Sequence, residues 1–470
     1  MKEIFEAILD DYIDGYSEEM TSDLQKLLTF DTTKAAARQQ APFGAGIAAA
    51  LQFVLQKADK WQLPCQNLEG YVGLIDYQTQ VKPSQKQVGI LCHIDTVPAG
   101  NAWTKEPFGG QISDGKIYGR GAVDDKGPLI ACLYALRALK ESNLPLNNKL
   151  RLIIGTDEES GFACMDYFLQ HCPKPDFGFT PDAQFPLIYG EKGIVHFELS
   201  AKRGDEAGDI VIKKLHGGVS DNVIPDRAEA FLTLSPHGSF LLEEAYAKWS
   251  DHDHLLLMAT DDGYNIKALG KTTHGSLPEK GRNAITLLLD FLNRLPVSGA
   301  TGVFLKNCYE LTGCDFDGSA LGVYAEDQYG KTSMAPTSLL MDDRKITVGI
   351  DFRFPVTFKW QYFLERIKKT AVFYGLHLAV SEAKEPLFVP LDEPFVQDLL
   401  QSYRQITGDD SEPLVIGGGT YARVFDKFVG YGPVFPKQEQ LAHQADEYLS
   451  QKDLIRLSKI YVQAMYVLSK

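Results

Sequence analysis

Apolar and polar residues recur along the chain with the two periods that are typical of helices and strands. Residues 3–29 repeat apolar positions at spacings of three and four, which predicts helix. Short apolar runs at 87–95, 149–156 and 176–180 are each the length of one buried strand, and residues 128–140 read as a helix between the first two. This alternation predicts an α/β domain with a mainly parallel sheet flanked by helices.

The pattern changes near residue 187. The segments 193–204 and 227–235 alternate apolar and polar residues, as half-buried antiparallel strands do. From about residue 388 the first pattern returns. We therefore expect a discontinuous α/β domain formed by residues 1–187 and 388–470, with a separate α+β domain of residues 188–387 inserted into it.

Composition limits the class of protein. A chain of 470 residues has room for two or three domains, and 44% hydrophobic with 23% charged residues allows a large core. The 47 basic and 62 acidic residues give a net charge of −15, the opposite of what a nucleic-acid binder carries. We expect no nucleic-acid partner, and an acidic enzyme that handles cations or small substrates fits this balance.

The chain also lacks signals for a membrane or for export. No apolar run approaches the length of a membrane span, and the acidic, amphipathic N-terminus is unlike a secretory signal. Seven cysteines, an odd number, are typical of reduced and mostly buried thiols. We therefore predict a cytoplasmic protein with no membrane partner.

Acidic and imidazole side chains follow the apolar runs at four places: His93 and Asp95; Asp124 and Asp125; Glu158 and Glu159; and Asp182. Ligands of open α/β sheets collect outside the carboxyl ends of the strands, so these side chains are expected to form one cluster. So many carboxylates repel one another unless cations neutralise them. Histidine with carboxylates is a ligand set for Zn²⁺ or Mn²⁺, and this number of acids needs more than one ion.

Each place also has a purely structural interpretation. Asp124-Asp125 is a plausible helix N-cap, Glu158-Glu159 a solvated turn, and Asp182 an ordinary turn residue. The four places in succession, each after an apolar run, favour the metal centre. Within it, Asp95 lies two residues from His93 on the same face of an extended segment, where it is placed to accept the second ring N–H of His93. Of two adjacent glutamates that point differently, one can bind metal while the other acts as a base.

Three motifs carry a resemblance to a known family. His-x-Asp-x-Val-Pro from His93, Gly-Arg-Gly-x-x-Asp-x-Lys-Gly around Asp124, and Asp-Glu-Glu-Ser-Gly around Glu158 occur in this order. Over essentially the whole chain, the sequence resembles the M20 family of metallopeptidases and, within it, the dipeptidases of the PepV type, the Xaa-His or β-Ala-Xaa dipeptidase group. The resemblance implies a zinc-peptidase-like catalytic domain and a lid whose two related halves stand in for a dimer partner, hence a monomer.

The resemblance also implies roles for the clustered residues. One zinc ion would be bound by His93 and Asp182, a second by Glu159 and His443, and Asp124 would bridge the two, with a cis peptide bond after it. Glu158 would be the general base and acid, and Asp95 would orient His93. On the sequence alone, His443 is an ordinary surface histidine, and only its position in the family motif makes it a candidate ligand.

Residues of the inserted domain match as well. The resemblance implies that His274 stabilises the oxyanion, that Asn222 contacts substrate and that Arg353 holds the substrate carboxylate. The alternatives are a turn histidine for His274 and an ion pair with Asp351 for Arg353. A glycine-rich loop with Gly418, Gly419 and Thr420 is suited to capture an anion through its N–H groups, and the resemblance adds it to the substrate-binding residues.

The expected function is hydrolysis of dipeptides by a water held between two zinc ions, with manganese or cobalt as acceptable replacements. An alternative on the same metal centre is deacylation or desuccinylation of N-acyl amino acids. A more distant alternative is a metal-binding protein without catalysis. That alternative predicts the loss of a ligand or of the base, and the sequence retains all of them.

Overall fold

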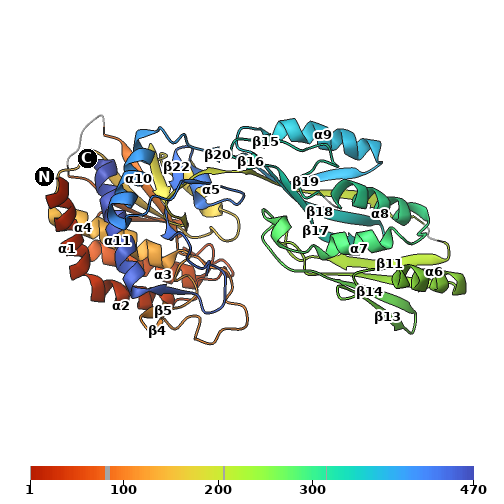
Figure 1. Ribbon diagram of the computed structural model, residues 1–470. Helices are drawn as coiled ribbons and strands as arrows, with labels where there is room; N and C mark the ends of the chain where they lie inside the picture. The colour runs from red at the N-terminus through yellow and green to blue at the C-terminus, as the bar shows by residue number, and fades with distance from the viewer. Residues whose placement is uncertain (1, 80–84, 205–206, 314) are drawn as a thin grey trace. The chain divides into compact units, whose positions relative to one another are not determined.

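The computed structural model describes residues 2–79, 85–204, 207–313 and 315–470 (Figure 1). The chain folds into two units. Unit 1 comprises Met1–Gly190, Phe388–Val415 and Thr420–Lys470, and unit 2 comprises Glu191–Leu387 and Ile416–Gly419. The short segment Ile416–Gly419, which the sequence pattern assigned to the α/β domain, therefore belongs to unit 2.

The main sheet of unit 1 has nine strands in the order β1-β2-β6-β3-β7-β22-β9-β20, with β21 paired to β9. Its strands are β1 (Cys65–Leu68), β2 (Val72–Tyr77), β3 (Gln87–His93), β6 (Lys149–Gly155), β7 (Phe177–Thr180), β9 (Ile188–Glu191), β20 (Leu387–Phe388), β21 (Leu414–Ile416) and β22 (Phe428–Gly430).

The sheet is mixed, with its parallel part at the centre. Strand β3 pairs in parallel with β6 and β7, and β7 pairs in parallel with β22. On one side of these strands β2 pairs antiparallel with β6, and β1 with β2. The predicted α/β class is confirmed, and the antiparallel strands flank the buried, nearly all-apolar runs β3 and β6.

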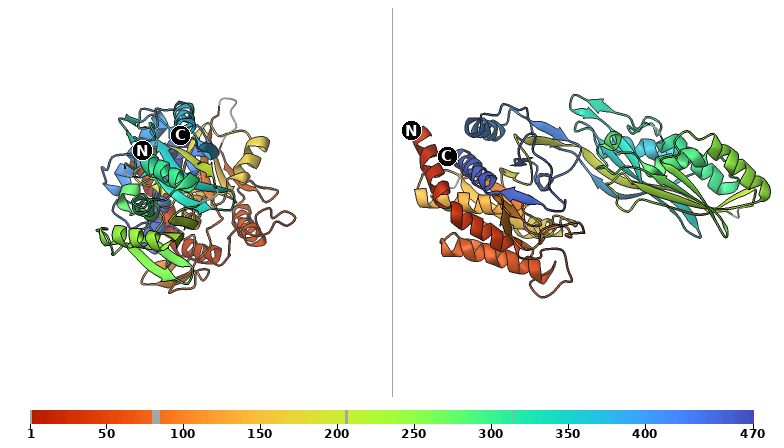
Figure 2. Two further views of the ribbon diagram at one scale, coloured as in Figure 1. Left: turned by 90° about the vertical axis from the view of Figure 1, so that its right-hand side faces the viewer. Right: turned by 60° about the horizontal axis from the view of Figure 1, so that its bottom comes forward.

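Helices cover both faces of this sheet. They are α1 (Lys2–Gly15), α2 (Ser17–Leu28), α3 (Ala45–Lys60), α4 (Lys126–Ser142), α5 (Ala163–His171), α10 (Pro394–Thr407) and α11 (Gln451–Ser469), with the 3₁₀ turn η2 (Tyr421–Val424). Helices α4 and α11 pack together on β3, and α1 lies beside α11 (Figure 2). On the opposite face Tyr421 of η2 packs against Gly155, and its hydroxyl meets the Cys164 thiol of α5 at 3.0 Å.

Two small sheets complete unit 1. Strand β5 (Lys116–Tyr118) pairs with β4 (Gln111–Ser113) and with β24 (Tyr448–Ser450), and β8 (Ala183–Gln184) pairs with β23 (Pro433–Val434). Because Tyr118 is opposite Tyr448, the segment after β5 lies beside the segment before β24. These two segments carry Asp124 and His443.

Unit 2 contains an eight-stranded antiparallel sheet in the order β13-β14-β12-β11-β17-β18-β10-β19. Its strands are β10 (Gly193–Lys202), β11 (Ile210–Gly217), β12 (Arg227–Leu234), β13 (Leu255–Thr260), β14 (Gly263–Leu269), β17 (Ser333–Met341), β18 (Lys345–Phe354) and β19 (His377–Lys384). Its helices are α6 (Pro236–Ala247), α7 (Ala284–Leu292), α8 (Gly299–Thr312) and α9 (Trp360–Phe373), with the 3₁₀ turn η1 (Pro278–Lys280) and the two-stranded sheet of β15 (Glu326–Asp327) and β16 (Gly330–Lys331).

Two features of the described residues bear on the sequence expectations. No helix among them is long and apolar enough to cross a membrane. The six cysteines that can be described are free thiols, and Cys314 lies outside the described residues.

Candidate metal centre

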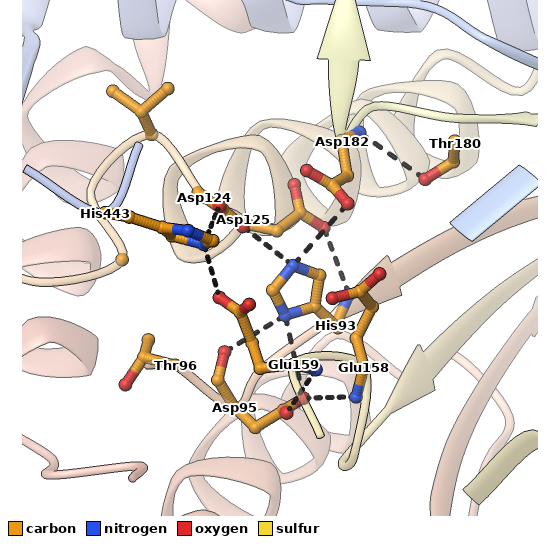
Figure 3. Close-up of polar contacts among 12 residues, drawn as sticks. His93, Asp95, Thr96, Asp124, Asp125, Glu158, Glu159, Thr180, Asp182 and His443 are labelled. Carbon is orange, nitrogen blue, oxygen red and sulfur yellow. Dashed lines mark hydrogen bonds and ion pairs between the residues drawn. The ribbon is translucent and has the colours of Figure 1, made fainter. Parts of the chain in front are cut away.

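The loops after three neighbouring parallel strands meet at one edge of the unit 1 sheet (Figure 3). Strand β3 ends at His93, β6 ends at Gly155 opposite it, and β7 ends at Thr180 on the other side of β3. These loops supply His93, Asp95, Glu158, Glu159 and Asp182, and the segments after β5 and before β24 add Asp124 and His443 to the same cluster. The parallel centre of the sheet therefore brings together side chains that are far apart in sequence.

His93 lies at the middle of this cluster and is fully buried. Its Nε2 is 2.9 Å from Oδ1 of Asp124 and 3.8 Å from Oδ2 of Asp182. Its Nδ1 is 3.0 Å from the main-chain carbonyl oxygen of Asp95, whereas the Asp95 carboxylate is 3.6 Å away. The ring is thus oriented mainly by the backbone of Asp95.

The Asp95 carboxylate instead fixes the two glutamates. Its oxygens accept the main-chain N–H groups of Glu158 at 3.1 Å and Glu159 at 3.0 Å. The expected orienting of His93 by Asp95 stays a prediction, since both the carbonyl and the carboxylate of Asp95 lie within 3.6 Å of Nδ1. The two anchored N–H groups hold the turn after β6, from which Glu158 and Glu159 project to different neighbours.

His443 reaches the cluster from the C-terminal segment. Its Nε2 is 3.1 Å from Oδ2 of Asp124 and 3.1 Å from Oε1 of Glu159. Asp124 therefore contacts both imidazoles, one with each carboxylate oxygen. The ring of His443 is half exposed.

Asp125 takes a role that the sequence did not indicate. A cis peptide bond joins it to Asp124, and its Oδ2 accepts the main-chain N–H of His93 at 3.0 Å. It occupies the N-cap position of α4, but its side chain makes no capping hydrogen bond. The capping interpretation of the Asp124-Asp125 pair is therefore wrong, and Asp125 supports His93 from within the core.

The crowded carboxylates perturb one another's ionisation. Burial, reinforced by the charge of Asp124, raises the pKa of Asp182 to about 7. Burial also raises the pKa of Glu158 well above its usual value, with the charges of Asp182 and Glu159 adding to the effect. The hydrogen bond to Asp124, and then that to Glu159, raises the pKa of His443 to about 11. The protein thus retains protons where several negative charges converge.

This donor set fits divalent cations. Ligand atoms of His93, Asp124 and Glu159 lie within 4.8 Å of one another, and so do those of His93, Glu158 and Asp182. Carboxylates and imidazoles are ligands of zinc, manganese and cobalt. Bound cations would offset the repulsion among the carboxylates, which raises their pKa values in the metal-free protein. Glu158 belongs to one of these groups, so geometry alone leaves both ligation and proton transfer open to it.

A second group of predicted residues lies in unit 2. Residues 222–224 run antiparallel to residues 273–275, with the Gly275 N–H donating to the Asn222 carbonyl at 2.7 Å. The Nδ1 of His274 accepts the main-chain N–H of Ser276 at 3.2 Å, which in a neutral ring leaves the proton on Nε2. Desolvation, and then the charge of Arg353, lowers the pKa of His274, so the ring is neutral at neutral pH.

Arg353 is almost fully buried and held by a neighbour on its own strand. Its Nε and Nη2 donate to the two oxygens of Asp351 at 2.6 and 2.8 Å, and its Nη1 donates to the Gly417 carbonyl at 3.4 Å. The ion pair proposed as an alternative is therefore present. The fork geometry leaves the guanidinium fixed in orientation beside the glycine-rich loop.

The glycine-rich loop makes one close packing contact and begins a short helical turn. Gly417 contacts Ser276, and a side chain there would collide with it, whereas a side chain at Gly418 would make only an ordinary contact with Ile416. The hydroxyl of Thr420 accepts the Ala422 N–H at 3.1 Å at the start of the 3₁₀ turn η2.

Sequence reasoning missed two buried residues next to the cluster, Arg120 and Glu447. They form an ion pair of 2.7 Å between elements more than 300 residues apart in the chain. Both belong to motifs in which other residues are the candidate ligands, Asp124 after Gly-Arg120-Gly and His443 in His443-Gln-Ala-Asp-Glu447. The signal in the sequence was a charged residue four positions from a candidate ligand, with Arg120 before Asp124 and Glu447 after His443.

Comparison with known proteins places these observations in context. Residues 89–466 match the family described as peptidase family M20/M25/M40. The chain is 33% identical over 460 residues to "Putative dipeptidase YtjP" of Bacillus subtilis (strain 168), covering 96% of this chain and 98% of that protein. It is 32% identical over 464 residues to "Putative dipeptidase SH1171" of Staphylococcus haemolyticus, with 97% and 98% coverage.

Solved structures share the fold at lower identity. An aminoacylhistidine dipeptidase from Vibrio alginolyticus aligns with a TM-score of 0.59 at 14% identity over 96% of both chains. Human carnosine dipeptidase 1 aligns with a TM-score of 0.54 at 14% identity over 98% of this chain and 99% of that chain.

Proposed function

The chain belongs to peptidase family M20/M25/M40, and from that premise we propose that it is a metal-dependent dipeptidase. The observation that carries the proposal is the cluster in which Asp124 lies between His93 and His443 with Glu158, Glu159 and Asp182 around them. The names of the relatives and the donor set of the site both support it. The nature of the metal is proposed as zinc, with manganese or cobalt as alternatives.

We assign the ligands as follows. His93 and Asp182 hold one ion, Glu159 and His443 hold a second, and Asp124 bridges them. When bound, such ions lower the pKa of a water and polarise the scissile carbonyl. The contacts of Asp124 with both imidazoles support its bridging role, and the contact of His443 with Glu159 supports their pairing on one ion.

Glu158 is the proposed general base. It is one of two adjacent glutamates, and Glu159 is already engaged by His443, which leaves Glu158 free of that histidine. Its raised pKa favours a carboxylate that accepts a proton from water and returns it to the leaving amine. Asp95 fixes the turn that presents both glutamates.

Unit 2 is proposed to act as a lid that recognises the carboxylate and the scissile carbonyl of a short substrate. The neutral His274, with its proton on Nε2, is suited to donate a hydrogen bond to the developing oxyanion. Arg353, oriented by Asp351, is suited to bind the substrate carboxylate together with Asn222 and the loop of Gly418, Gly419 and Thr420. A lid of this kind is proposed to restrict the substrate to dipeptides.

The test is turnover by protein reconstituted with zinc, manganese or cobalt and freed of excess metal. The substrates are a dipeptide panel, matched N-acetyl and N-succinyl amino acids, and tripeptides. We expect turnover of dipeptides that a chelator abolishes and metal restores. Failure on every dipeptide with every metal overturns the proposal, and preference for the N-acyl amino acids replaces it with a deacylase.

A further inference from the structure

Glu447 is a buried carboxylate that holds the loop leading to Asp124. The residue is fully buried, and its Oε1 accepts the main-chain N–H groups of Val123 at 2.8 Å and Asp124 at 3.2 Å. Its Oε2 accepts hydrogen bonds from the N–H of Gly121 at 3.0 Å and from Nη1 of Arg120 at 2.7 Å. One side chain therefore satisfies three backbone donors of a single four-residue loop.

Arg120 performs the reciprocal task for the segment that carries His443. Its guanidinium donates from Nη1 to the Gln444 carbonyl at 3.1 Å and from Nη2 to the His443 carbonyl at 3.3 Å. It also donates to the Ala99 carbonyl at 3.2 Å and lies over the Trp103 ring, 5.1 Å from its centroid. Arg120 is 2% exposed, so these contacts are made out of water.

The His443 segment needs such support because its backbone is strained. His443 has a φ of +64° and Asp446 a φ of +56°, in the left-handed region that residues with side chains seldom adopt. Asp446 is tied down separately, since its carboxylate accepts the N–H of Thr104 at 2.8 Å and of Lys105 at 3.1 Å. The backbone of His443 itself is contacted by Arg120.

We propose that Arg120 and Glu447 are positioning residues that set the separation of Asp124 and His443, and with it the affinity for the ion these two share. The inference rests on the proposed two-ion function. A buried ion pair is a poor source of stability, because desolvating both charges offsets their attraction. Its many backbone contacts instead fix geometry, and partners behind metal ligands typically change metal affinity or activity by about 10–100-fold when removed.

The test is a calorimetric titration of the metal-free full chain with Zn²⁺ alone. It is carried out on the wild type, Glu447→Gln and Arg120→Lys. Glu447→Gln replaces one acceptor by an N–H₂ group that faces donors, and Arg120→Lys keeps the charge but loses the fork. We expect two ions in the wild type. In each variant one of the two binding steps weakens by about 10–100-fold. The step affected is the one that His443→Ala abolishes.

Asp76→Asn is the matched control, because it weakens another carboxylate–arginine pair of unit 1, with Arg151, between strands β2 and β6 and away from the cluster. It should leave both binding steps unchanged. Restoration of the weakened step by Glu447→Asp, which retains the charge, further supports the proposal. Should Glu447→Gln fail to fold, Arg120→Lys carries the test.

Equal weakening of both steps, or no weakening in a folded variant, overturns the positioning role. Binding of fewer than two ions by the wild type is a different result, since it overturns the two-ion centre of the proposed function itself.

Discussion

At the scale of single residues, the structure separates the two adjacent glutamates. Both main-chain N–H groups donate to Asp95, yet only Glu159 contacts His443. Identical side chains one residue apart thus meet different surroundings. This difference supports Glu159 as a metal ligand and Glu158 as the general base.

Glu158→Gln should therefore reduce turnover without removing the metal. A glutamine has nearly the same shape but accepts no proton from water, and loss of a general base typically lowers the rate by about 10²–10⁴-fold. The measurement is kcat on a dipeptide together with elemental analysis of bound metal. Glu18→Gln, on the exposed start of α2, is the control. Loss of metal along with activity would instead make Glu158 a ligand.

The affinity for metal should depend on pH, and the slope of its logarithm against pH should change near pH 7. Below that pH Asp182, whose pKa is raised to about 7, is protonated in the metal-free protein, and the ion must displace that proton. His443, with a pKa of about 11, releases a proton at every pH from 6 to 8. Affinity should thus fall by one further factor of about ten per pH unit below 7.

Calorimetry in buffers of different ionisation heat counts these protons directly. About one proton more should be released at pH 6 than at pH 8 for zinc binding. Asp182→Asn should remove the difference. An unchanged proton count between the two values would contradict the assignment of Asp182 as the group that titrates.

Asp351→Asn should weaken substrate binding through Arg353. The variant loses one of two charge-assisted bonds that hold the guanidinium, and a bond to a charged group contributes about 1.5–3 kcal/mol. We expect KM for dipeptides to rise by about 10–100-fold with a smaller change in kcat. A dipeptide with an amidated C-terminus is the control substrate. An equal effect on the amide would contradict recognition of the carboxylate.

At the scale of elements, the apolar runs predicted the strands and helices whose formation depends on local sequence. The strand predicted at 87–95 is observed as Gln87–His93, and the helix predicted at 128–140 as Lys126–Ser142. The acids and imidazoles at the strand ends could be predicted to meet because parallel strands end at one edge. The Arg120–Glu447 pair could not, because only the pairing of β5 with β24 brings its segments together.

Asn283 caps helix α7 and ties it to the sheet of unit 2. Its Oδ1 accepts the N–H groups of Ile285 and Thr286 at the start of α7, and its Nδ2 donates to the Pro336 carbonyl of β17 at 2.7 Å. Asn283→Ala should lower the free energy of unfolding by about 1–3 kcal/mol, since a buried cap and a buried acceptor lose their partner.

Urea unfolding and hydrogen exchange of the α7 amides measure this loss. Ser298→Ala is the matched control, because Ser298 precedes α8 without capping it and should change stability by no more than about 0.5 kcal/mol. An equal loss in both variants would show that the capping bonds of Asn283 contribute nothing particular.

At the scale of the whole molecule, the sheet of unit 2 consists of two halves built in the same order. A hairpin, a helix and an edge strand follow one another in β11–β12–α6–β13 and again in β17–β18–α9–β19. The hairpin strands β11 and β17 meet at the middle of the sheet, and β14 and β10 take equivalent third positions. The inner edges of the two halves are thus already paired with each other.

This internal pairing leads to a prediction about assembly. Closed symmetric dimers pair a surface with the same surface of a second copy, and here a second half within the same chain occupies the pairing edge. We therefore expect a monomer of 52.2 kDa in solution, measured by sedimentation equilibrium over a wide range of protein concentration. Dipeptide turnover per chain should also be independent of concentration. A stable species of twice that mass would show that the repeated half does not replace a partner.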